Sequence, residues 1–543
     1  EYDLGTDVVV VGSGAAGLSA AIAAADGGAD VVMIEKTDMI GGTTGVSGGM
    51  PWIPMNRHMS DLEMADSREE ALGYIRRLTL GREPDPAVLE TYVDSAPEVM
   101  EYLETKTPLR MSVPAGFGDY YGDLPGAKSL GRSLEPVPFD VRASLPDWAS
   151  RLRTSPYLPW LTMAEGAKFL TGKQPPDPAV EAERRTSDTR VLGAALVAAL
   201  FKGILDRDVE VLTHTAVDEL LMEDDTVVGV RARTPDTTRY ISARRGVVLA
   251  CGGFEWDEQM VRCFTGLKLH PMSPSGNEGD GHRMAMRGGA ELANMGSFWG
   301  QPAIFEPGFE YEGRGAPQMG TFRSTPGVIV VNRHGKRFTN EGVTYQDFCK
   351  GFGIYDPVAI DYPNDPPVWM IFDQKVKDWA VILPTVLPGQ DAPEWILRGD
   401  TVGDLAQRLG IDPDALELTV RRWNEQVAEL DDREFHRGTV WFETFMCGPP
   451  SARKCLAPVS SPPFYAIELH LATLGTNGGP RTDADGRVRR HGGGVVEGLY
   501  AAGNTAACVF GPAYPGGGAT LGPALVFGFL AGRHAATRSA PRG

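Results

Sequence analysis

The first 35 residues contain apolar runs of two different lengths. Residues 7–11 are an aspartate followed by four valines, the pattern of a parallel β-strand that is buried on both faces. The alanine-rich stretch at 18–25 predicts a helix, and the glycine pair at 27–28 predicts its end. A second apolar run at 31–34 predicts another strand. This part of the chain therefore predicts a strand–helix–strand unit.

The pattern changes several times along the rest of the chain. Residues 60–106 have helical spacing, whereas residues 107–185 are rich in Pro, Gly and aromatic residues and predict long surface loops. The pattern then predicts a helix at 192–204 and strands at 209–212, 226–232, 240–242 and 246–250. This rhythm is lost between about 300 and 470 and returns with a strand at 498–501 and an apolar helix at 523–536. The interruption predicts an inserted domain.

The turn after the first strand carries a glycine-rich motif. Its sequence is Gly12-Ser13-Gly14-Ala15-Ala16-Gly17, and the second strand ends at Glu35. In this motif the first glycine permits a tight turn, the second lets the backbone approach a pyrophosphate, and the third allows close helix–strand packing. The helix N-terminus directs free N–H groups at the phosphates, and Glu35 can accept hydrogen bonds from ribose hydroxyls. We therefore predict that the chain binds a dinucleotide.

A second glycine-rich segment indicates which dinucleotide it is. Residues 41–49, Gly-Gly-Thr-Thr-Gly-Val-Ser-Gly-Gly, follow soon after Lys36. Such a segment suits the extended body of a flavin and predicts FAD, although an ordinary surface loop is an alternative. No His or Cys stands in a flavin-linkage context, so we expect non-covalent binding. The expected fold is α/β, with a Rossmann-like FAD-binding domain at 1–300 and 473–543 and an inserted α+β catalytic cap domain at 301–472.

Length and charge narrow the class of protein. A chain of 543 residues is too long for one compact core, which agrees with two domains. The chain has 52 Lys and Arg against 71 Asp and Glu, a net charge of −19, which argues against nucleic acid or an anionic membrane as a partner. No apolar run reaches the roughly 18 residues of a membrane-spanning helix, and no signal peptide is visible. We expect a cytoplasmic protein.

Cysteine and histidine patterns argue against several catalytic classes. The six cysteines form no C-x-x-C pair, and the nine histidines form no pair at i, i+4. A zinc site or a disulfide framework is therefore not expected, and a reducing compartment is the default. The chain also lacks the G-x-S-x-G motif of serine hydrolases. We predict no metal site.

Several ordered blocks give the chain a resemblance to a known family. They are the Gly12–Gly17 turn with Glu35, the Gly41–Gly49 segment running into Trp52-Ile53-Pro54, Gly131–Pro136, Cys251–Glu255, Asn277–Gly281, Gly335–Glu341, Leu474–Gly479, Ala501–Asn504 and Tyr514–Gly522. Together they cover nearly the whole length. The chain resembles flavin-dependent 3-ketosteroid dehydrogenases of the fumarate-reductase-like FAD superfamily. The 1,2-dehydrogenating members look closest, because of the Trp52-Ile53-Pro54 stretch and the chain length.

The resemblance implies a reaction and roles for particular residues. A base removes a proton α to a ketone, the β hydride passes to the flavin, and donors hold the ketone oxygen. Tyr345 falls at the position of the base, Tyr514 at that of the hydroxyl donor, and Gly518 supplies a backbone N–H. A supporting tyrosine falls in a block that departs from the family, with Gly122 in place of an expected proline. The choice there between Tyr120, which we favour, and Tyr121 stays open.

The glycine-rich motifs and the resemblance together imply a set of FAD-binding residues. Besides residues 12–17, Glu35 and Lys36, the expected residues are Gly42, Thr43, Thr44, Ser47, Gly48, Gly49, Ala216, Val217, Gly252, Gly253, Asp280, Asn504, Thr520 and Leu521. The final helix begins close to the last of these, so its N-terminus could stabilise negative charge on the reduced flavin.

Other activities remain as alternatives at this point. One is 4,5-desaturation of a 3-keto-5α-steroid, or the desaturation of another cyclic ketone. A second is fumarate-reductase-like chemistry, which needs cationic groups that the Tyr514–Gly522 and Leu474–Gly479 blocks lack. A third is a flavin-binding protein without catalysis. The expected partners are a steroid substrate and an electron acceptor such as a quinone, with no nucleic acid, and loose membrane association is left open.

Overall fold

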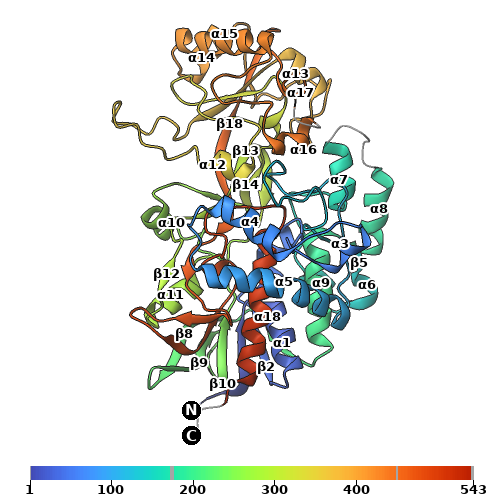
Figure 1. The fold of residues 1–543 in the computed structure, drawn as a ribbon, viewed down its shortest axis with the longest axis vertical. Coiled ribbons are helices and arrows are strands. Elements are labelled where there is room, and N and C mark those ends of the chain that lie inside the picture. Colours follow the sequence, from blue (N-terminus) through green and yellow to red (C-terminus); the bar gives the residue numbers. More distant parts are fainter. Residues whose placement is uncertain (1, 171–176, 448–450, 540–543) are drawn as a thin grey trace.

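The computed structural model describes residues 2–170, 177–447 and 451–539. Two β-sheets follow each other along the longest axis of the molecule (Figure 1). The first sheet lies near the two chain termini, and the second sheet belongs to the middle of the sequence. Helices α14 (Val402–Leu409) and α15 (Pro413–Glu429) lie at the far end of the second sheet.

The first sheet contains the predicted strand–helix–strand unit. Its strands are β1 (Leu4–Val11), β2 (Val31–Ile34), β7 (Glu210–Leu212), β8 (Ala216–Glu223), β9 (Thr226–Arg233), β10 (Thr238–Leu249), β20 (Arg487–Arg489) and β21 (Val495–Ala501). β1 pairs in parallel with β2 and β10, and β21 also runs parallel to β10. The predicted order of elements at the N-terminus is confirmed, and β10 is one strand where the sequence predicted two.

Three apolar helices pack together beside this sheet, namely α1 (Ala15–Asp26), α9 (Leu192–Leu205) and α18 (Leu521–Thr537). Glycine makes the contact between α1 and α18 close. A Cβ atom on Gly528 would lie 2.3 Å from the Ala16 carbonyl oxygen, and one on Gly532 would lie 2.0 Å from that of Ala20. The first and last helices of the chain are thereby fixed against each other, and both begin at segments predicted to bind FAD.

The second sheet is built around two long strands. It contains β11 (His270–Pro271), β13 (Phe298–Tyr311), β14 (Arg314–Met319), β15 (Ile329–Val331), β16 (Val368–Asp373), β17 (Leu397–Gly399) and β18 (Phe464–Thr476). β13 and β18 pair antiparallel from Phe298–Thr476 to Ala303–His470. The predicted domain limits at 301 and 472 fall inside these two strands, and the division itself stays a prediction.

Further helices and short strands complete the two regions. The helices are α2 (Gly42–Val46), α3 (Arg57–Asp61), α4 (Arg68–Thr79), α5 (Pro86–Lys106), α10 (Glu258–Thr265), α11 (Asp280–Arg287), α12 (Tyr345–Cys349), α13 (Gln374–Trp379), α16 (Thr444–Cys447) and α17 (Ala452–Cys455), with 3₁₀ helices η1 (Ala149–Arg151), η2 (Thr321–Ser324), η3 (Trp441–Glu443) and η4 (Gly503–Thr505). Two-stranded pairs join β3 (Met111–Ser112) to β4 (Glu135–Pro136), β5 (Phe139–Asp140) to β6 (Thr189–Arg190), and β12 (Leu292–Ala293) to β19 (Gly479–Pro480).

The prediction of loops over 107–185 is wrong in part. This stretch contains α6 (Val141–Ser144), α7 (Met163–Leu170) and α8 (Pro178–Ser187). The start of α8 carried a sequence signal, because Asp177 caps the helix by accepting from the Ala179 N–H at 2.9 Å and Pro178 takes the first helical position. The segment at 41–49 also differs from a simple loop, since its first half forms α2.

The structure holds no helix that could span a lipid bilayer within the described ranges, which agrees with the sequence. In the same ranges no group of His, Cys, Asp and Glu is placed to hold a metal ion.

Candidate active site

Helix α1 begins at the turn where the sequence predicted the pyrophosphate. Gly12 has a φ of 107°, and a Cβ atom there would lie 2.2 Å from the Ala250 carbonyl oxygen, so only glycine fits. A Cβ atom on Gly17 would lie 1.9 Å from the Gly12 oxygen. The N-cap residue Gly14 makes no side-chain capping hydrogen bond. The first turn of α1 thus presents the backbone N–H groups of Ala16 and Gly17, which are donors of the kind that bind phosphate.

The second glycine-rich segment is fixed directly to this turn. The Ala15 N–H donates to Thr44 Oγ1 at 3.0 Å, and the Gly41 N–H donates to Ser13 Oγ at 3.0 Å. A Cβ atom on Gly49 would lie 2.4 Å from the Leu192 carbonyl carbon, so this end of the segment lies directly on the start of α9. The predicted residues Gly42, Thr43 and Thr44 lie in α2, and Ser47, Gly48 and Gly49 follow it.

Polar side chains gather where strand β2 ends. Glu35 accepts hydrogen bonds from Ser13 Oγ at 2.6 Å and from the Thr37 N–H at 2.9 Å. Lys36 Nζ donates to Asp280 Oδ2 at 2.9 Å, and Asp280 is the first residue of α11. The structure therefore brings together four predicted FAD-binding residues from three separate segments of the sequence.

The other predicted cofactor residues lie on segments around the same region. Ala216 and Val217 open β8, Gly252 and Gly253 follow β10, Asn504 lies in η4, and Thr520 and Leu521 open α18. The Thr215 N–H, immediately before β8, donates to the Glu35 carbonyl oxygen at 3.0 Å. Asn504 Oδ1 accepts from Trp299 Nε1 at 3.1 Å, which connects η4 to the second sheet. The start of β8 thus lies beside the end of β2, and η4 lies against the start of β13.

The capping of helices shows that this neighbourhood suits FAD. Helices α4, α5, α10 and α13 each begin with a side-chain cap, whereas α1, α11 and α18 have no capping side-chain hydrogen bond at Gly14, Gly279 and Thr520, and neither do α2 and α9. Uncapped N-termini leave N–H donors for another acceptor. A pyrophosphate and the pyrimidine edge of a flavin are such acceptors, so the donor set fits FAD.

Three predicted catalytic tyrosines, Tyr120, Tyr345 and Tyr514, form one buried cluster, called the tyrosine cluster below. The hydroxyl oxygens of Tyr120 and Tyr345 lie 3.0 Å apart. The ring of Tyr514 stacks on that of Tyr120 at a centroid distance of 5.8 Å and meets that of Tyr345 edge-on at 5.3 Å. Three distant segments of the chain thus direct their phenols to one place.

The structure distinguishes Tyr120 from Tyr121, between which the sequence left the choice open. The Tyr121 hydroxyl donates to Asp347 Oδ2 at 2.5 Å, whereas the Tyr120 hydroxyl contacts Tyr345. Both contacts reach α12, where Tyr345 is the first residue and Thr344 caps the helix by accepting from the Asp347 N–H at 3.0 Å. Tyr120 is therefore the tyrosine that lies beside the predicted base.

Burial controls the ionisation of the tyrosine cluster. Desolvation is the main cause that raises the pKa of Tyr514 to about 12, and it raises the pKa values of Tyr120 and Tyr345 even further above the usual value. A neutral Tyr514 hydroxyl can donate a hydrogen bond throughout the ordinary pH range. As a base, Tyr345 needs a donor that stabilises its phenolate, and the Tyr120 hydroxyl is close enough to be that donor.

The loop after Tyr514 is held by two side chains and one backbone N–H group for which the sequence gave no role. Tyr74 Oη donates to the Pro515 carbonyl oxygen at 2.6 Å, and Ser133 Oγ donates to that of Gly517 at 2.8 Å. The backbone N–H of Trp52 donates to the carbonyl oxygen of Gly518 at 3.1 Å. Trp52 and Ser133 belong to two blocks of the family resemblance, which was the signal that could have identified them as supports.

Gly518 occupies a position that only glycine can take. Its φ is 99°, and a Cβ atom would lie 2.4 Å from the Met50 carbonyl oxygen. Among the residues that the structure describes, its N–H has no hydrogen-bond partner. This N–H and the Tyr514 hydroxyl are thus two donors on one rigid loop.

Aromatic residues from the second region cover the tyrosine cluster. The ring centroids of Phe442 and Phe445 lie 4.8 Å and 5.7 Å from that of Tyr120. A Cβ atom on Gly122 would lie 2.1 Å from the Trp441 indole, which explains why glycine stands where the family pattern suggested proline. Sequence reasoning missed these residues because nothing local signals a contact across more than 300 residues.

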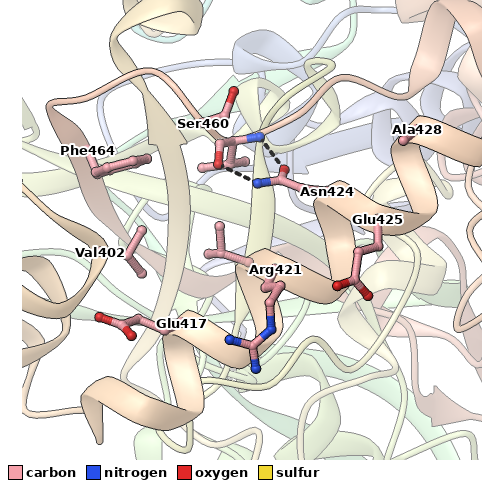
Figure 2. A pocket seen from close by; sticks show the side chains of 10 residues that line it. Val402, Glu417, Arg421, Asn424, Glu425, Ala428, Ser460 and Phe464 are labelled. Atoms are coloured by element: carbon pink, nitrogen blue, oxygen red, sulfur yellow. Dashed lines mark hydrogen bonds between the residues drawn. The ribbon is translucent and has the colours of Figure 1, made fainter.

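A separate surface hollow lies on the second region, between α14, α15 and β18 (Figure 2). Asn424 forms one wall by exchanging two hydrogen bonds with the backbone of Val459, at 2.8 Å and 2.9 Å. The lining of the hollow includes Glu417, Arg421 and Glu425, and it includes none of the predicted site residues. None of the residues to which the sequence assigned a catalytic role therefore lies at this hollow.

Comparison with known proteins gives matches over nearly the full length. The family model for the FAD binding domain matches residues 7–521. The chain is 35% identical to the 3-oxosteroid 1-dehydrogenase of Mycobacterium tuberculosis, over 99% of both chains. It is also 35% identical to the 4-oxocyclohexanecarboxylate 2-dehydrogenase of Sinomonas cyclohexanicum, over 99% of this chain and 95% of that protein.

A solved structure matches the whole fold. It is the 3-ketosteroid Δ1-dehydrogenase of Sterolibacterium denitrificans in complex with 1,4-androstadiene-3,17-dione, with a TM-score of 0.88 and 35% identity. The match covers 98% of this chain and 99% of that one. The expected fold, a Rossmann-like region with a second α+β region, is thereby confirmed.

Proposed function

The chain belongs to the FAD binding domain family of flavoenzymes, and we propose that it is an FAD-dependent oxidoreductase that desaturates the C1–C2 bond of 3-ketosteroids. The observation that carries this proposal is the tyrosine cluster beside the Gly518 loop. It combines a base candidate, a supporting phenol and two donors in one apolar site. Hydrolytic or metal-dependent reactions would need groups of another kind.

The ketone oxygen is the first group that the site must hold. Removal of a proton beside a ketone places negative charge on its oxygen, and donors aimed at that charge lower the barrier. We assign this role to the Tyr514 hydroxyl and the Gly518 N–H. The rigid 515–518 loop supports the assignment, because its carbonyl groups are held by Tyr74, Ser133 and Trp52.

Tyr345 is the proposed base that removes the C2 proton. Its hydroxyl lies 3.0 Å from that of Tyr120, which can donate to the developing phenolate. FAD, when bound, supplies the acceptor for the hydride from C1. Loss of that hydride alone would leave a cation, so the proton must depart with it or before it. The apolar surroundings favour a phenol here, because a carboxylate would carry a desolvation cost.

The lining of the site favours a large apolar ketone over a small ketone that carries a carboxylate. The ring neighbours of the tyrosine cluster are Phe442, Phe445 and Trp299. Aromatic side chains bury a polycyclic hydrocarbon well, whereas a substrate carboxylate would require a cation. We therefore propose a steroid, and a cyclohexanone carboxylate is the second candidate because one relative of equal identity bears that name.

Anaerobic titration with a 4-ene-3-ketosteroid tests the proposed function. The flavin absorbance of the holoenzyme should bleach stoichiometrically, and the product should be the 1,4-diene. Reduction by 4-oxocyclohexanecarboxylate alone would overturn the steroid assignment. Formation of the 4-ene from a 3-keto-5α-steroid, with no 1,2-desaturation, would move the reaction to C4–C5. Reoxidation by a soluble quinone, the proposed acceptor, is followed in the same cuvette.

A further inference from the structure

The turn between β13 and β14 (residues 311–314), called the β13–β14 turn below, reaches from the second sheet to loops of the first region. Glu312 and Gly313 have φ values of 52° and 72°, so the chain reverses tightly between the two strands. The side chains of Tyr311, Glu312 and Arg314 each contact a residue outside the second sheet.

The strongest of these contacts is an ion pair with Arg153. Arg153 Nη1 lies 2.6 Å from Glu312 Oε1 and donates to Tyr311 Oη at 2.9 Å. The Arg153 side chain is 6% exposed and that of Glu312 is 26% exposed, so solvent screens the pair only from the side of Glu312. The other carboxylate oxygen of Glu312 accepts from the Ser275 N–H at 2.8 Å. Both oxygens of Glu312 are thus used, one by each of two separate segments.

Both partners of Glu312 lead directly to predicted FAD-binding residues. Arg153 Nη2 lies 3.4 Å from Thr37 Oγ1, and the Thr37 N–H donates to the Glu35 carboxylate at 2.9 Å. Ser275 lies two residues before Asn277, whose Nδ2 donates to Thr43 Oγ1 at 2.8 Å.

A third contact from the turn reaches the same loops. The Arg314 guanidinium lies 5.2 Å from the centre of the Trp256 ring, a cation–π distance. The backbone N–H of Trp256 donates to the Asn277 carbonyl oxygen at 3.1 Å. In addition, Arg153 Nε is buried and has no hydrogen-bond partner among the residues described. The turn thus joins the segments that carry Glu35, Thr43 and Asn277.

We propose that the β13–β14 turn is a clamp that slows the release of FAD, with Glu312 as its central residue. For FAD to leave, the segments around Glu35 and Thr43 must separate, and the turn ties them together through Arg153 and Ser275. The inference rests on FAD binding and adds residues from the second region to the retention of the cofactor. It is independent of which ketone the enzyme oxidises.

Glu312→Asn tests the clamp, because asparagine accepts the left-handed backbone but is too short to reach both partners. The holoenzyme is diluted, and FAD release is followed by the rise of its fluorescence. We expect release to accelerate about tenfold or more, the size of one hydrogen bond to a charged group. The matched control is Asp225→Asn at the β8–β9 turn, where Asp225 has a φ of 63° and pairs with Arg490 at 3.7 Å. The control should release FAD at the wild-type rate.

Two results would overturn the clamp. One is an unchanged release rate in Glu312→Asn, and the other is an equal acceleration in Asp225→Asn. Thermal unfolding with excess FAD separates retention from stability. Stabilisation by FAD depends on its Kd even at saturation, so the clamp predicts for Glu312→Asn only the lowering of the midpoint that the weaker FAD affinity causes. A wild-type enzyme that no steroid reduces would contradict the proposed function and leave the release rates as a separate result.

Discussion

Two buried polar clusters lie at the two ends of the segment at 337–345. The ion cluster consists of Arg337, Glu341, Asp432 and Arg437, whose side chains are at most 1% exposed. Arg337 forms bidentate pairs with both carboxylates at 2.8–2.9 Å. The tyrosine cluster, at the other end of the segment, holds three neutral phenols. One cluster is fully ionic and the other contains no formal charge.

The difference between the clusters shows which of them supports the fold and which has donors left for a substrate. In the ion cluster Arg437 also donates to the carbonyl oxygens of Val328, Ser324 and Thr325, so its donors are used by the protein itself. Charges removed from water this completely are stable only when they are paired, and they hold the segment in one conformation. The tyrosine cluster leaves the Gly518 N–H without a partner in the described structure. Unused donors near a base are what a reacting ketone requires.

The largest effect is expected from Tyr345→Phe. Loss of a general base lowers a rate by about 10²–10⁴-fold, and no other base lies in the cluster. FAD should stay bound, because the contacts of Tyr345 in the described structure are with the rings of Tyr120, Phe442 and Tyr514. Steady-state desaturation and the flavin spectrum measure both points. Tyr121→Phe is the matched control, since it removes a hydroxyl that donates a hydrogen bond to Asp347 on the same helix as Tyr345. This variant should retain most of the activity.

In the ion cluster, Glu341→Gln should act on stability instead of on the chemical step. The substitution leaves the two buried guanidinium groups of Arg337 and Arg437 with one carboxylate, that of Asp432. Breaking a buried ion pair lowers the free energy of unfolding by about 3–5 kcal/mol. Chemical unfolding, followed by tryptophan fluorescence because Trp423 lies 4.5 Å from the Arg337 guanidinium, measures the loss. A variant as stable as the wild type would show that the cluster does not hold the segment.

A smaller effect is expected from Tyr514→Phe. One donor to the ketone oxygen is lost while the Gly518 N–H remains, so turnover should fall by about 10²–10³-fold. The ring contacts of Tyr514 with Tyr120 and Trp299 are preserved by phenylalanine, so folding and FAD content should not change. Full activity with intact flavin would remove Tyr514 from the site.

The two clusters should also give different pH dependences: the ion cluster should affect stability at acid pH, and the tyrosine cluster should affect the rate at alkaline pH. Pairing with arginine lowers the pKa values of Glu341 and Asp432 against the opposing effect of burial. A lowered folded-state pKa gives stability that is present above the unfolded value of about 4 and is lost as the pH falls through the folded value. Burial raises the pKa of Tyr345, so the active phenolate, and with it the rate, should increase as the pH rises. Acid unfolding curves and a pH–rate profile measure these effects.

The sequence predicted the FAD-binding region better than the supports of the tyrosine cluster. The region at 12–35 is predictable because each glycine serves a local purpose, such as the close contact of Gly17 with Gly12. Arg337 shows the limit, since it is buried against Asp432, which lies 95 residues further on in the sequence. Phe442 likewise reaches Tyr120 across the two regions. Such contacts depend on the assembled fold and leave no local pattern.

The central claim is that Tyr345 removes the proton α to the ketone. Exchange of that hydrogen can be measured in deuterated buffer by mass spectrometry, with the bound steroid and without turnover. Wild-type enzyme should exchange the C2 hydrogen, Tyr120→Phe should exchange it more slowly, and Tyr345→Phe should show no exchange above the uncatalysed rate. Exchange at the wild-type rate in Tyr345→Phe would contradict the account, because another residue would then be the base.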